Sequence, residues 1–371
     1  MTRTGEGDDD AQLIPPVPAG DLTYGDDDLL VLGDERTLPP WSIVAGGAVA
    51  LAIVIGLVSL KRDGQHAAAP VASAVVSESP TQQQVQPIGT PIDLGQTSAV
   101  DVELAAGRLF VLCTEPSQLG QVDAKTGVLK RQVAAPLGAQ YLVADPVGQL
   151  LWVIAGSRVF AYDAPTLAPL GKLEVSRDVT VAATLDGRLF LDTDHGIYVA
   201  GPRDSAAALL AGFSGQVLLD IAPDPVRHRL LAITVGYELL VVTTRGVQIV
   251  RQLKEQLPTS IAVTKAGIWA VGFGPAGGSR LARVDPRTLK FTPVGAGDPD
   301  APQGGQGWAG ESVVWTRFPY LDSITCRDAR TGAVVGSFPN TIGQVVSTRG
   351  VAYGLSGGTV VQLATTRACP G

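Results

Sequence analysis

The sequence is poor in histidine, with only three among its 371 residues. A metal centre or a two-histidine proton relay draws on several imidazoles, so few remain from which to assemble one. The chain also contains no HExxH zinc motif and no phosphate-binding loop. These absences disfavour an enzyme, and we expect no catalytic residue.

Cysteine is equally scarce, because the chain holds only Cys113, Cys326 and Cys369. No two of them have the CxxC spacing that supplies two zinc ligands from one turn, so a zinc site is excluded. Among the three possible pairings we favour a disulfide between Cys326 and Cys369. Both should lie toward the ends of neighbouring outer strands, and the C-terminal tail is free to adjust. The alternative is three unpaired thiols.

Basic residues are too few and too dispersed for a nucleic-acid partner. The chain has 28 Lys and Arg against 35 Asp and Glu, and residues 1–40 alone hold ten of the acids and two of the bases. The rest of the chain is therefore close to neutral and has no basic stripe, so we expect no nucleic acid among its partners. Arg outnumbers Lys 21 to 7, a ratio typical of a high-GC bacterial genome.

The first 91 residues predict three segments. Residues 1–40, rich in Asp, Gly and Pro, predict a disordered acidic tail. Residues 41–60 carry no charge and would span about 30 Å as a helix, which predicts a single transmembrane helix. Residues 61–91, rich in Ala, Pro, Ser, Thr and Gln, predict a flexible stalk.

The membrane orientation is read from two opposing signals. Lys61 and Arg62 follow the apolar segment and only Arg36 closely precedes it, so the positive-inside rule alone places the C-terminal part in the cytoplasm. The stalk composition is typical of an external domain lifted off a membrane. We therefore expect a cell-membrane protein with a cytoplasmic N-terminus and an extracytoplasmic C-terminal domain.

From residue 92 onward, a turn followed by an apolar strand that ends in a large residue recurs every 38 to 46 residues. Such a period is typical of a β-propeller blade of four strands. The seven occurrences are marked by Phe110, Trp152, Phe190, Leu231, Trp269, Trp315 and Tyr353. Residues 92–371 therefore predict an all-β domain, a seven-bladed β-propeller. We expect the segment around Pro91 to Leu94 to complete the last blade and remove its open edge.

A second feature, Asp-x-x-Thr, follows the marker strand in four of the repeats. It begins at Asp123, Asp163, Asp285 and Asp328. The Asp side chain can accept a backbone N–H of a tight turn while Thr closes the other side, so the motif predicts a link between two outer strands. The repeats near Gly201 and Thr243 lack it.

These repeats, a Gly-Arg-Leu-Phe-Val strand followed by Asp-x-x-Thr-Gly, resemble the bacterial YVTN-type and quinoprotein (PQQ)-like propeller families. The resemblance covers roughly residues 92–371 and implies a propeller, WD40-like in architecture, rather than an activity. Quinoprotein repeats usually carry a Trp shortly after the Gly, whereas Val128-Leu129 and Ala333-Val334 stand there in this chain. We therefore expect no bound quinone and no other cofactor.

Two sets of residues are candidates for a site. Asp101, Asp178 and Asp220 could meet in the central channel and hold a divalent cation, as in lactonase-like propellers, or could be polar only because they face water. Trp308, Trp315, Phe318 and Tyr320 follow a long loop and could form a recognition surface, or could pack between blades. Residues 192–196, Asp-Thr-Asp-His-Gly, predict a hairpin turn rather than a metal site.

The favoured function is a membrane-anchored, non-catalytic scaffold that binds a protein or envelope ligand on a propeller face. One alternative is a metal-dependent lactonase-like or hydrolase-like enzyme. Another is a transmembrane sensor that signals through the acidic tail. Metal content would separate the enzyme from the scaffold, and a cytosolic partner lost on deleting the tail would favour the sensor.

Overall fold

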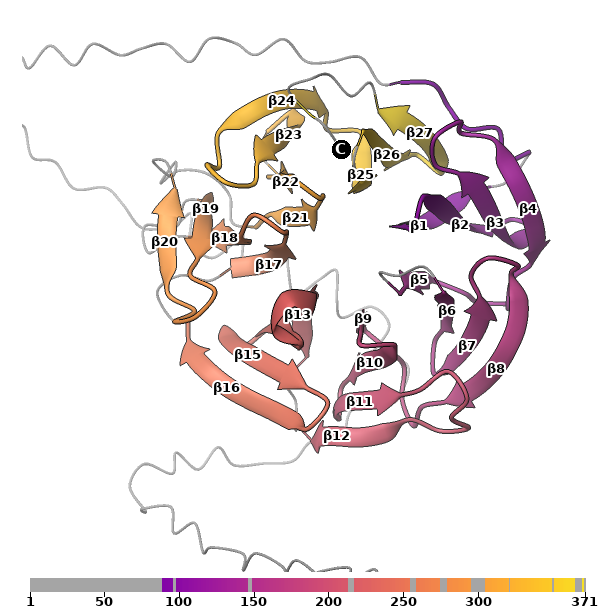
Figure 1. The fold of residues 1–371 in the computed structure, drawn as a ribbon, viewed down its shortest axis with the longest axis horizontal. Coiled ribbons are helices and arrows are strands. Elements are labelled where there is room, and N and C mark those ends of the chain that lie inside the picture. The colour runs from indigo at the N-terminus through magenta and orange to yellow at the C-terminus, as the bar shows by residue number, and fades with distance from the viewer. Residues whose placement is uncertain are drawn as a thin grey trace, which may run out of the picture. The chain divides into compact units, whose positions relative to one another are not determined.

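The chain from residue 89 onward forms a closed ring of seven β-sheets (Figure 1). The computed structural model describes residues 89–95, 98–145, 149–212, 217–253, 258–273, 279–294, 304–319, 321–348, 350–363 and Cys369. All of them belong to the compact unit Glu78–Gly371. The expected tail (1–40), transmembrane helix (41–60) and nearly all of the expected stalk (61–91) lie outside the described residues. Among the described residues, no helix has the length and apolar character to cross a membrane.

Each sheet is one propeller blade whose strands follow one another from the centre outward. Blade 1 contains β1 (Ala99–Ala105), β2 (Arg108–Thr114), β3 (Ser117–Asp123) and β4 (Leu129–Ala134), and blade 2 contains β5 (Tyr141–Ala144), β6 (Leu150–Ala155), β7 (Arg158–Asp163) and β8 (Ala168–Glu174). Blade 3 contains β9 (Val181–Leu185), β10 (Arg188–Thr193), β11 (Gly196–Ala200) and β12 (Ala208–Gly212). Blade 4 contains β13 (Leu218–Asp224), the 3-10 turn η1 (Pro225–Arg227), β14 (Arg229–Thr234), β15 (Glu238–Thr243) and β16 (Gly246–Gln252).

The remaining three blades repeat this arrangement. Blade 5 contains β17 (Pro258–Val263), β18 (Ile268–Phe273), β19 (Ser279–Val284) and β20 (Phe291–Val294), and blade 6 contains β21 (Gln306–Ala309), β22 (Val313–Arg317), β23 (Ser323–Asp328) and β24 (Val334–Pro339). Blade 7 contains β25 (Ile342–Thr348), β26 (Val351–Ser356) and β27 (Thr359–Leu363). Successive innermost strands contact each other all the way round, and β25 contacts β1. The prediction of an all-β, seven-bladed propeller is confirmed.

The ring closes through residues that precede the first blade, as the sequence predicts. Pro91 forms an antiparallel bridge with Val361 at the outer edge of β27. Ile92 N–H donates to the Val360 carbonyl at 2.8 Å, and Gln362 N–H donates to the Thr90 carbonyl at 3.0 Å. Residues 90–92, hereafter the closing strand, thus give blade 7 its fourth strand and cover an edge that would otherwise be unpaired.

The core is divided among seven apolar clusters, each between two adjacent blades. The second strand of each blade is sandwiched between neighbouring sheets and is apolar on both faces, which explains why these strands read as continuous apolar runs. Every marker residue lies in such a strand and is at most 1% exposed. No blade can bury its two faces alone, so each is stabilised by its neighbours.

Candidate binding site at the centre of one face

One face of the propeller carries all the described turns that join first to second strands and third to fourth strands. Neighbouring strands in a blade are antiparallel, so these two kinds of turn emerge at the same end of the sheet. We call it the turn face. The geometry of its turns decides how rigid the face is.

The four Asp-x-x-Thr turns have the geometry that the sequence predicts. In each turn the Asp carboxylate accepts the Thr backbone N–H at 2.7 to 3.0 Å and also accepts the Thr hydroxyl. These hydrogen bonds from Thr hold the pKa of the carboxyl below its usual value in Asp123, Asp285 and Asp328. Each of these turns is therefore stabilised from within.

The same turns are also fastened to the preceding blade. In each, the carbonyl of the residue after Asp accepts a hydrogen bond from a side chain of that blade. The pairs are Tyr353 Oη with Ala124 at 2.7 Å, Gln121 Nε2 with Ala164 at 2.7 Å, Arg229 Nη2 with Pro286 at 2.6 Å, and Trp269 Nε1 with Ala329 at 2.9 Å. The motif thus joins two blades as well as two strands.

Trp152 shows what happens where the motif is missing. It occupies in blade 2 the position that Trp269 holds in blade 5, and its ring packs against blade 3. The connection between the third and fourth strands of blade 3, residues 201–207, has no Asp-x-x-Thr turn. The buried Nε1 of Trp152 has no hydrogen-bond acceptor, because the carbonyl that the motif would supply is absent.

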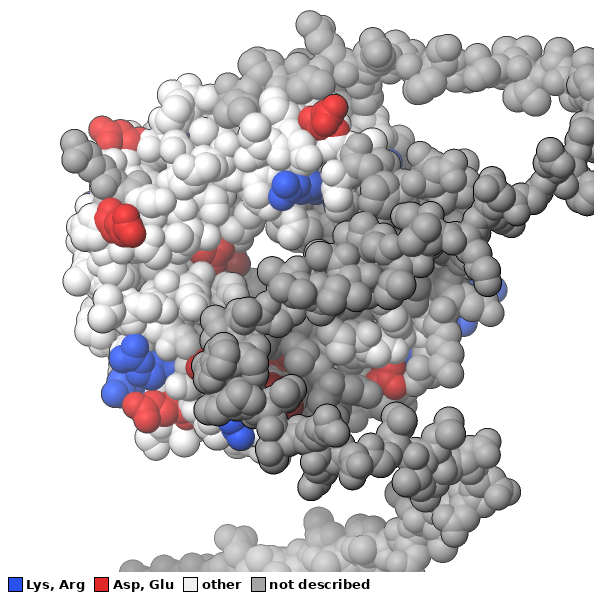
Figure 2. All heavy atoms as spheres, turned by 180° about the vertical axis from the view of Figure 1, so that it is seen from behind, with Lys and Arg blue, Asp and Glu red and all other residues white. Residues whose placement is uncertain are grey.

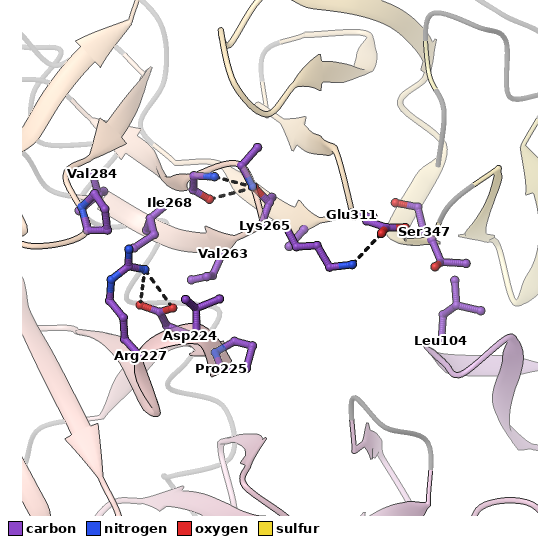
Figure 3. A pocket seen from close by; sticks show the side chains of 18 of the residues that line it. Leu104, Asp224, Pro225, Arg227, Val263, Lys265, Ile268, Val284, Glu311 and Ser347 are labelled. Carbon is purple, nitrogen blue, oxygen red and sulfur yellow. Dashed lines mark hydrogen bonds and ion pairs between the residues drawn. The ribbon is translucent and has the colours of Figure 1, made fainter.

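A hollow of about 620 Å³ opens at the centre of the turn face (Figure 3). The turns between first and second strands of five blades build it. Its lining includes Leu104 to Ala106 from blade 1, Asp224 to Arg227 from blade 4, Val263 to Ile268 from blade 5, Ala309 to Glu311 from blade 6, and Ser347 and Thr348 from blade 7. Arg283, Val284 and Pro286 of blade 5 complete it. We call it the central pocket.

Two ion-pair groups organise the charges of the central pocket. Asp224 is 1% exposed and accepts from Arg229 Nε at 3.0 Å and from Arg227 Nη1 at 3.3 Å. Lys265 reaches from its turn in blade 5 to Glu311 in blade 6, with Nζ 2.7 Å from Oε1 (Figure 3). Arg283 is exposed on the same lining. None of these residues belongs to a motif that marks it as a candidate in the sequence.

A second hollow, of about 320 Å³, shares Leu104, Val263, Ala309 and Ser347 with the central pocket and continues it into the channel. Glu103 and Asp220 add carboxyl groups to its lining. Burial, and secondly the charge of Asp101, raise the pKa of Glu103 well above its usual value. Burial also raises the pKa of Asp220, against the effect of its hydrogen bonds. The lining of this hollow is therefore acidic in composition.

The three aspartates proposed as metal ligands lie apart. Asp101 in β1 accepts Leu142 N–H of blade 2 at 2.5 Å, and burial raises its pKa to about 6. Asp220 in β13 accepts the Ser260 hydroxyl at 2.6 Å and Ile261 N–H at 2.8 Å, both in blade 5. Asp178 is exposed in the loop between β8 and β9. Within the described ranges, no group of three His, Cys, Asp or Glu side chains could hold a metal ion.

In this structure Asp101 and Asp220 connect blades. Each lies near the start of a first strand and reaches a backbone N–H of the first strand of the next blade. Gln344 makes a comparable link, since its Nε2 donates to the Val102 carbonyl at 3.0 Å and thereby joins blade 7 to blade 1. Around the channel, polar side chains thus tie the innermost strands to one another.

Two of the four aromatic residues proposed as a recognition surface lie inside the protein. Trp315 is fully buried and Phe318 is 4% exposed, both in clusters between blades. Trp308 in β21 is half-buried and borders the channel hollow. Tyr320 lies outside the described residues. Neither Trp315 nor Phe318 is accessible to a partner here.

Residues 192–196 form a hairpin turn between β10 and β11, which confirms the interpretation of this segment as a turn. His195 N–H donates to Thr193 Oγ1 at 3.1 Å. Asp192 points away from the turn and accepts from Thr180 Oγ1 at 2.7 Å and from Leu218 N–H at 2.9 Å. Its role in the structure is to connect blade 3 to blade 4.

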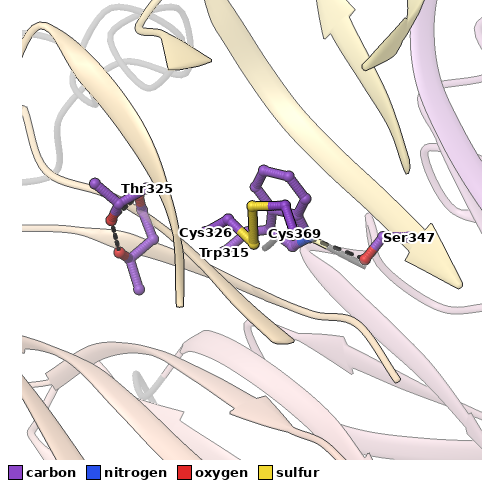
Figure 4. Close-up of a disulfide and its surroundings, with 6 residues drawn as sticks. Trp315, Thr325, Cys326, Ser347 and Cys369 are labelled. Carbon is purple, nitrogen blue, oxygen red and sulfur yellow. Dashed lines mark hydrogen bonds between the residues drawn. A yellow bond between two sulfur atoms is a disulfide. The ribbon is translucent and has the colours of Figure 1, made fainter. Parts of the chain in front are cut away.

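A disulfide joins Cys326 in β23 to Cys369 in the C-terminal segment (Figure 4). Both cysteines are buried among residues of blades 6 and 7, beside Trp315, whose Nε1 donates to Ser347 Oγ at 2.9 Å. A Cβ atom on Gly336 would lie 2.5 Å from Cys369 Sγ, so glycine at this position makes room for the C-terminal segment. Cys113 is buried in β2.

The surface shown in Figure 2 carries charged side chains of both signs, scattered among uncharged ones. No extended area of a single sign is visible on its described part. This pattern agrees with the near-neutral composition beyond residue 40.

The comparisons with known proteins identify the fold and no more. No protein-family model and no curated protein matches the sequence. The β-propeller domain of Myceliophteria thermophila Cps50 (Swd1) is similar in structure, with a TM-score of 0.59, 12% sequence identity, and coverage of 75% of this chain and 99% of that one. The WD40 repeats of RRP9 are similar with a TM-score of 0.56 and 10% identity over 76% of this chain and 99% of that chain.

Hydrazine synthase of Kuenenia stuttgartiensis is similar over 72% of this chain and 96% of that chain, with a TM-score of 0.55 and 12% identity. At such identities a likeness in structure shows a shared architecture and says nothing about shared ligands. The similarity to YVTN-type and quinoprotein-like repeats therefore remains a resemblance. The chain has the architecture of a WD40-like β-propeller.

Proposed function

We propose that this protein is a membrane-tethered scaffold whose propeller binds a protein partner at the central pocket of the turn face. The observation that carries the proposal is the open hollow of about 620 Å³ to which five blades contribute turns. Recognition sites are commonly concave and assembled on loops that a rigid framework positions. Here the hydrogen bonds between blades supply that framework.

The proposal places residues 41–60 in the membrane and the propeller outside the cytoplasm. Disulfides persist in oxidising compartments and are rare in the cytosol of most organisms, so the pairing of Cys326 with Cys369 supports an external propeller. This argument opposes the positive-inside count, whose margin is Lys61 and Arg62 against Arg36. The WD40-like architecture supports a scaffold role at the level of fold alone.

Epitope tags at the two ends of the full-length chain test the tether and its orientation. On intact cells, permeable at most in an outer envelope, we expect an antibody to reach the C-terminal tag and not the N-terminal one. Alkaline carbonate should leave the full-length chain in the membrane fraction and release a variant that lacks residues 41–60. Staining of the N-terminal tag alone would contradict the orientation, and complete extraction of the full-length chain would contradict the tether.

Photo-crosslinking in living cells tests the binding site. A photoreactive amino acid in place of Lys265, whose side chain is 77% exposed at the pocket, should yield a crosslinked partner. The matched control is Lys172 in the outer strand β8, which is 55% exposed and lies outside the pocket lining. Equal crosslinking from both positions, or none from position 265, would refute the central pocket as the binding site.

A further inference from the structure

The central pocket combines an apolar floor with a basic rim. Val263 in its lining is half-buried, and Val226, which also belongs to the lining, is 72% exposed. An exposed apolar group within a concave surface gains free energy when a partner covers it. The floor therefore suits an apolar side chain of the partner.

The charges that face solvent around this floor are predominantly positive. Asp224 is buried beneath two arginines, so its negative charge is directed inward while Arg227 remains 37% exposed. Lys265 is 77% exposed, whereas its partner Glu311 is 32% exposed. Arg283 adds an exposed guanidinium. In each of these ion pairs the acidic side chain is less exposed to solvent than the basic side chain.

The acidic groups of the channel hollow lie beyond the central pocket, since neither Glu103 nor Asp220 belongs to the lining of that pocket. The pKa values of Glu103 and Asp220 are raised by burial, and Asp220 already accepts hydrogen bonds from Ser260 and Ile261. A ligand at the pocket mouth therefore meets exposed cations first. Such preorganised cations attract carboxylates and orient them through charge-assisted hydrogen bonds.

We infer that the central pocket recognises an acidic protein segment in which carboxylates flank an apolar side chain. The apolar side chain lies against Val226 and Val263, and the carboxylates contact Lys265 and Arg283. The inference rests on the proposed function and adds the chemical class of the partner. A basic segment, whose side chain would pass the rim and approach Glu103, is the competing possibility.

Binding of fluorescein-labelled short peptides to the purified full-length protein tests the inference. The probes are a Glu/Leu peptide and a Lys/Leu peptide of the same length and pattern. At low salt we expect the Glu/Leu peptide to bind about tenfold or more tightly than the Lys/Leu peptide, because its carboxylates can form two or more ion pairs with the exposed cations of the rim. Equal or tighter binding of the Lys/Leu peptide would overturn the inference.

Variants locate the effect. A Lys265→Gln, Arg283→Gln double variant should weaken binding of the Glu/Leu peptide about tenfold, because both exposed cations are lost. A Lys172→Gln variant, changed at the outer strand β8, should bind as the unmodified protein does. Unchanged binding by the double variant would count against the central pocket as an acid-binding site.

The photo-crosslinked partner separates this inference from the proposed function. Mass spectrometry of the adduct at position 265 identifies the segment in contact with the pocket. An acidic segment with an apolar residue supports both statements. A neutral or basic segment leaves the scaffold function standing and refutes the inference, whereas the absence of any adduct refutes the central pocket as the binding site of the scaffold.

Discussion

The free energy of the hydrogen bond between Trp269 and the Asp-x-x-Thr turn of blade 6 can be obtained by comparison with Trp152, an equivalent residue that lacks such a bond. Trp269 and Trp152 occupy equivalent positions in second strands, and each is 1% exposed. Trp269 Nε1 donates to the Ala329 carbonyl at 2.9 Å, whereas Trp152 Nε1 has no acceptor. Phenylalanine at either position removes the same atoms from a buried site between blades.

The two substitutions should differ by the free energy of that hydrogen bond. Trp269→Phe leaves the Ala329 carbonyl without a donor inside the protein, at a cost of about 1–3 kcal/mol. Trp152→Phe removes an N–H group that is already unsatisfied, so it loses packing but no hydrogen bond. We therefore expect Trp269→Phe to lower the free energy of unfolding by about 2 kcal/mol more than Trp152→Phe does.

Urea unfolding of the two full-length variants, followed by far-ultraviolet circular dichroism, gives the comparison. The slopes of the two transitions should agree, because the surface exposed on unfolding is nearly the same. The reasoning would be refuted by equal destabilisation of the two variants, or by a larger loss for Trp152→Phe. Either result would mean that the hydrogen bond from Trp269 to the motif makes no measurable contribution to the free energy of unfolding.

Three further predictions concern single sites. Cys369→Ser opens a disulfide whose cysteines are 43 residues apart and should lower the free energy of unfolding by about 4 kcal/mol, after which a reductant has no further effect on the urea midpoint. Asp101 has a folded pKa of about 6, above its ordinary 3.8, so its contribution to stability is fully present below about pH 4 and is lost as the pH rises through 6. Asp101→Asn should abolish this part of the pH dependence, as unfolding titrations between pH 4 and 8 would show. Gly196→Ala should cost about 3 kcal/mol and lower the thermal midpoint, since φ is +138° and the new Cβ would lie 2.1 Å from the Ala211 carbonyl oxygen.

The fold was predictable because its signals are local and repeated. One marker residue occurs in the second strand of every blade. Because this strand is buried on both faces, it is an apolar run in every blade and can be recognised in the sequence. The Asp-x-x-Thr turns could also be predicted, since Asp and Thr bond to each other within four residues. The closing strand followed from the need to complete blade 7 once its own strands had been counted.

The central pocket was not predictable from the same signals. Lys265 and Glu311 are 46 residues apart and meet only because blades 5 and 6 are adjacent. The turns between first and second strands share no motif, so nothing in the sequence distinguishes Arg227 or Lys265 from ordinary surface cations. An alignment of the residues just before each marker would have predicted that these turns lie on one face. It would not have predicted which of their side chains are in contact.

The candidate aspartates illustrate a different limit. A carboxylate beside an apolar strand indicated a special role, and the structure agrees with one for Asp101, which is buried, and for Asp220, which is half-buried. The sequence could not tell a ligand from a residue that binds backbone N–H groups, because both require a carboxylate at the start of an inner strand. Only the partners in the next blade, Leu142 and Ile261, separate the two roles.

The position of the closing strand has a mechanical consequence. The polypeptide before residue 89 runs directly into it, so a pull on the N-terminal part of the chain loads the edge of blade 7 before any other blade. That load falls first on the two hydrogen bonds to Val360 and from Gln362, whereas the disulfide secures the seam on the other side of the same blade. Tension would therefore detach the closing strand from β27 first, while the apolar cluster and the side-chain hydrogen bonds between blades 7 and 1 still hold the ring closed.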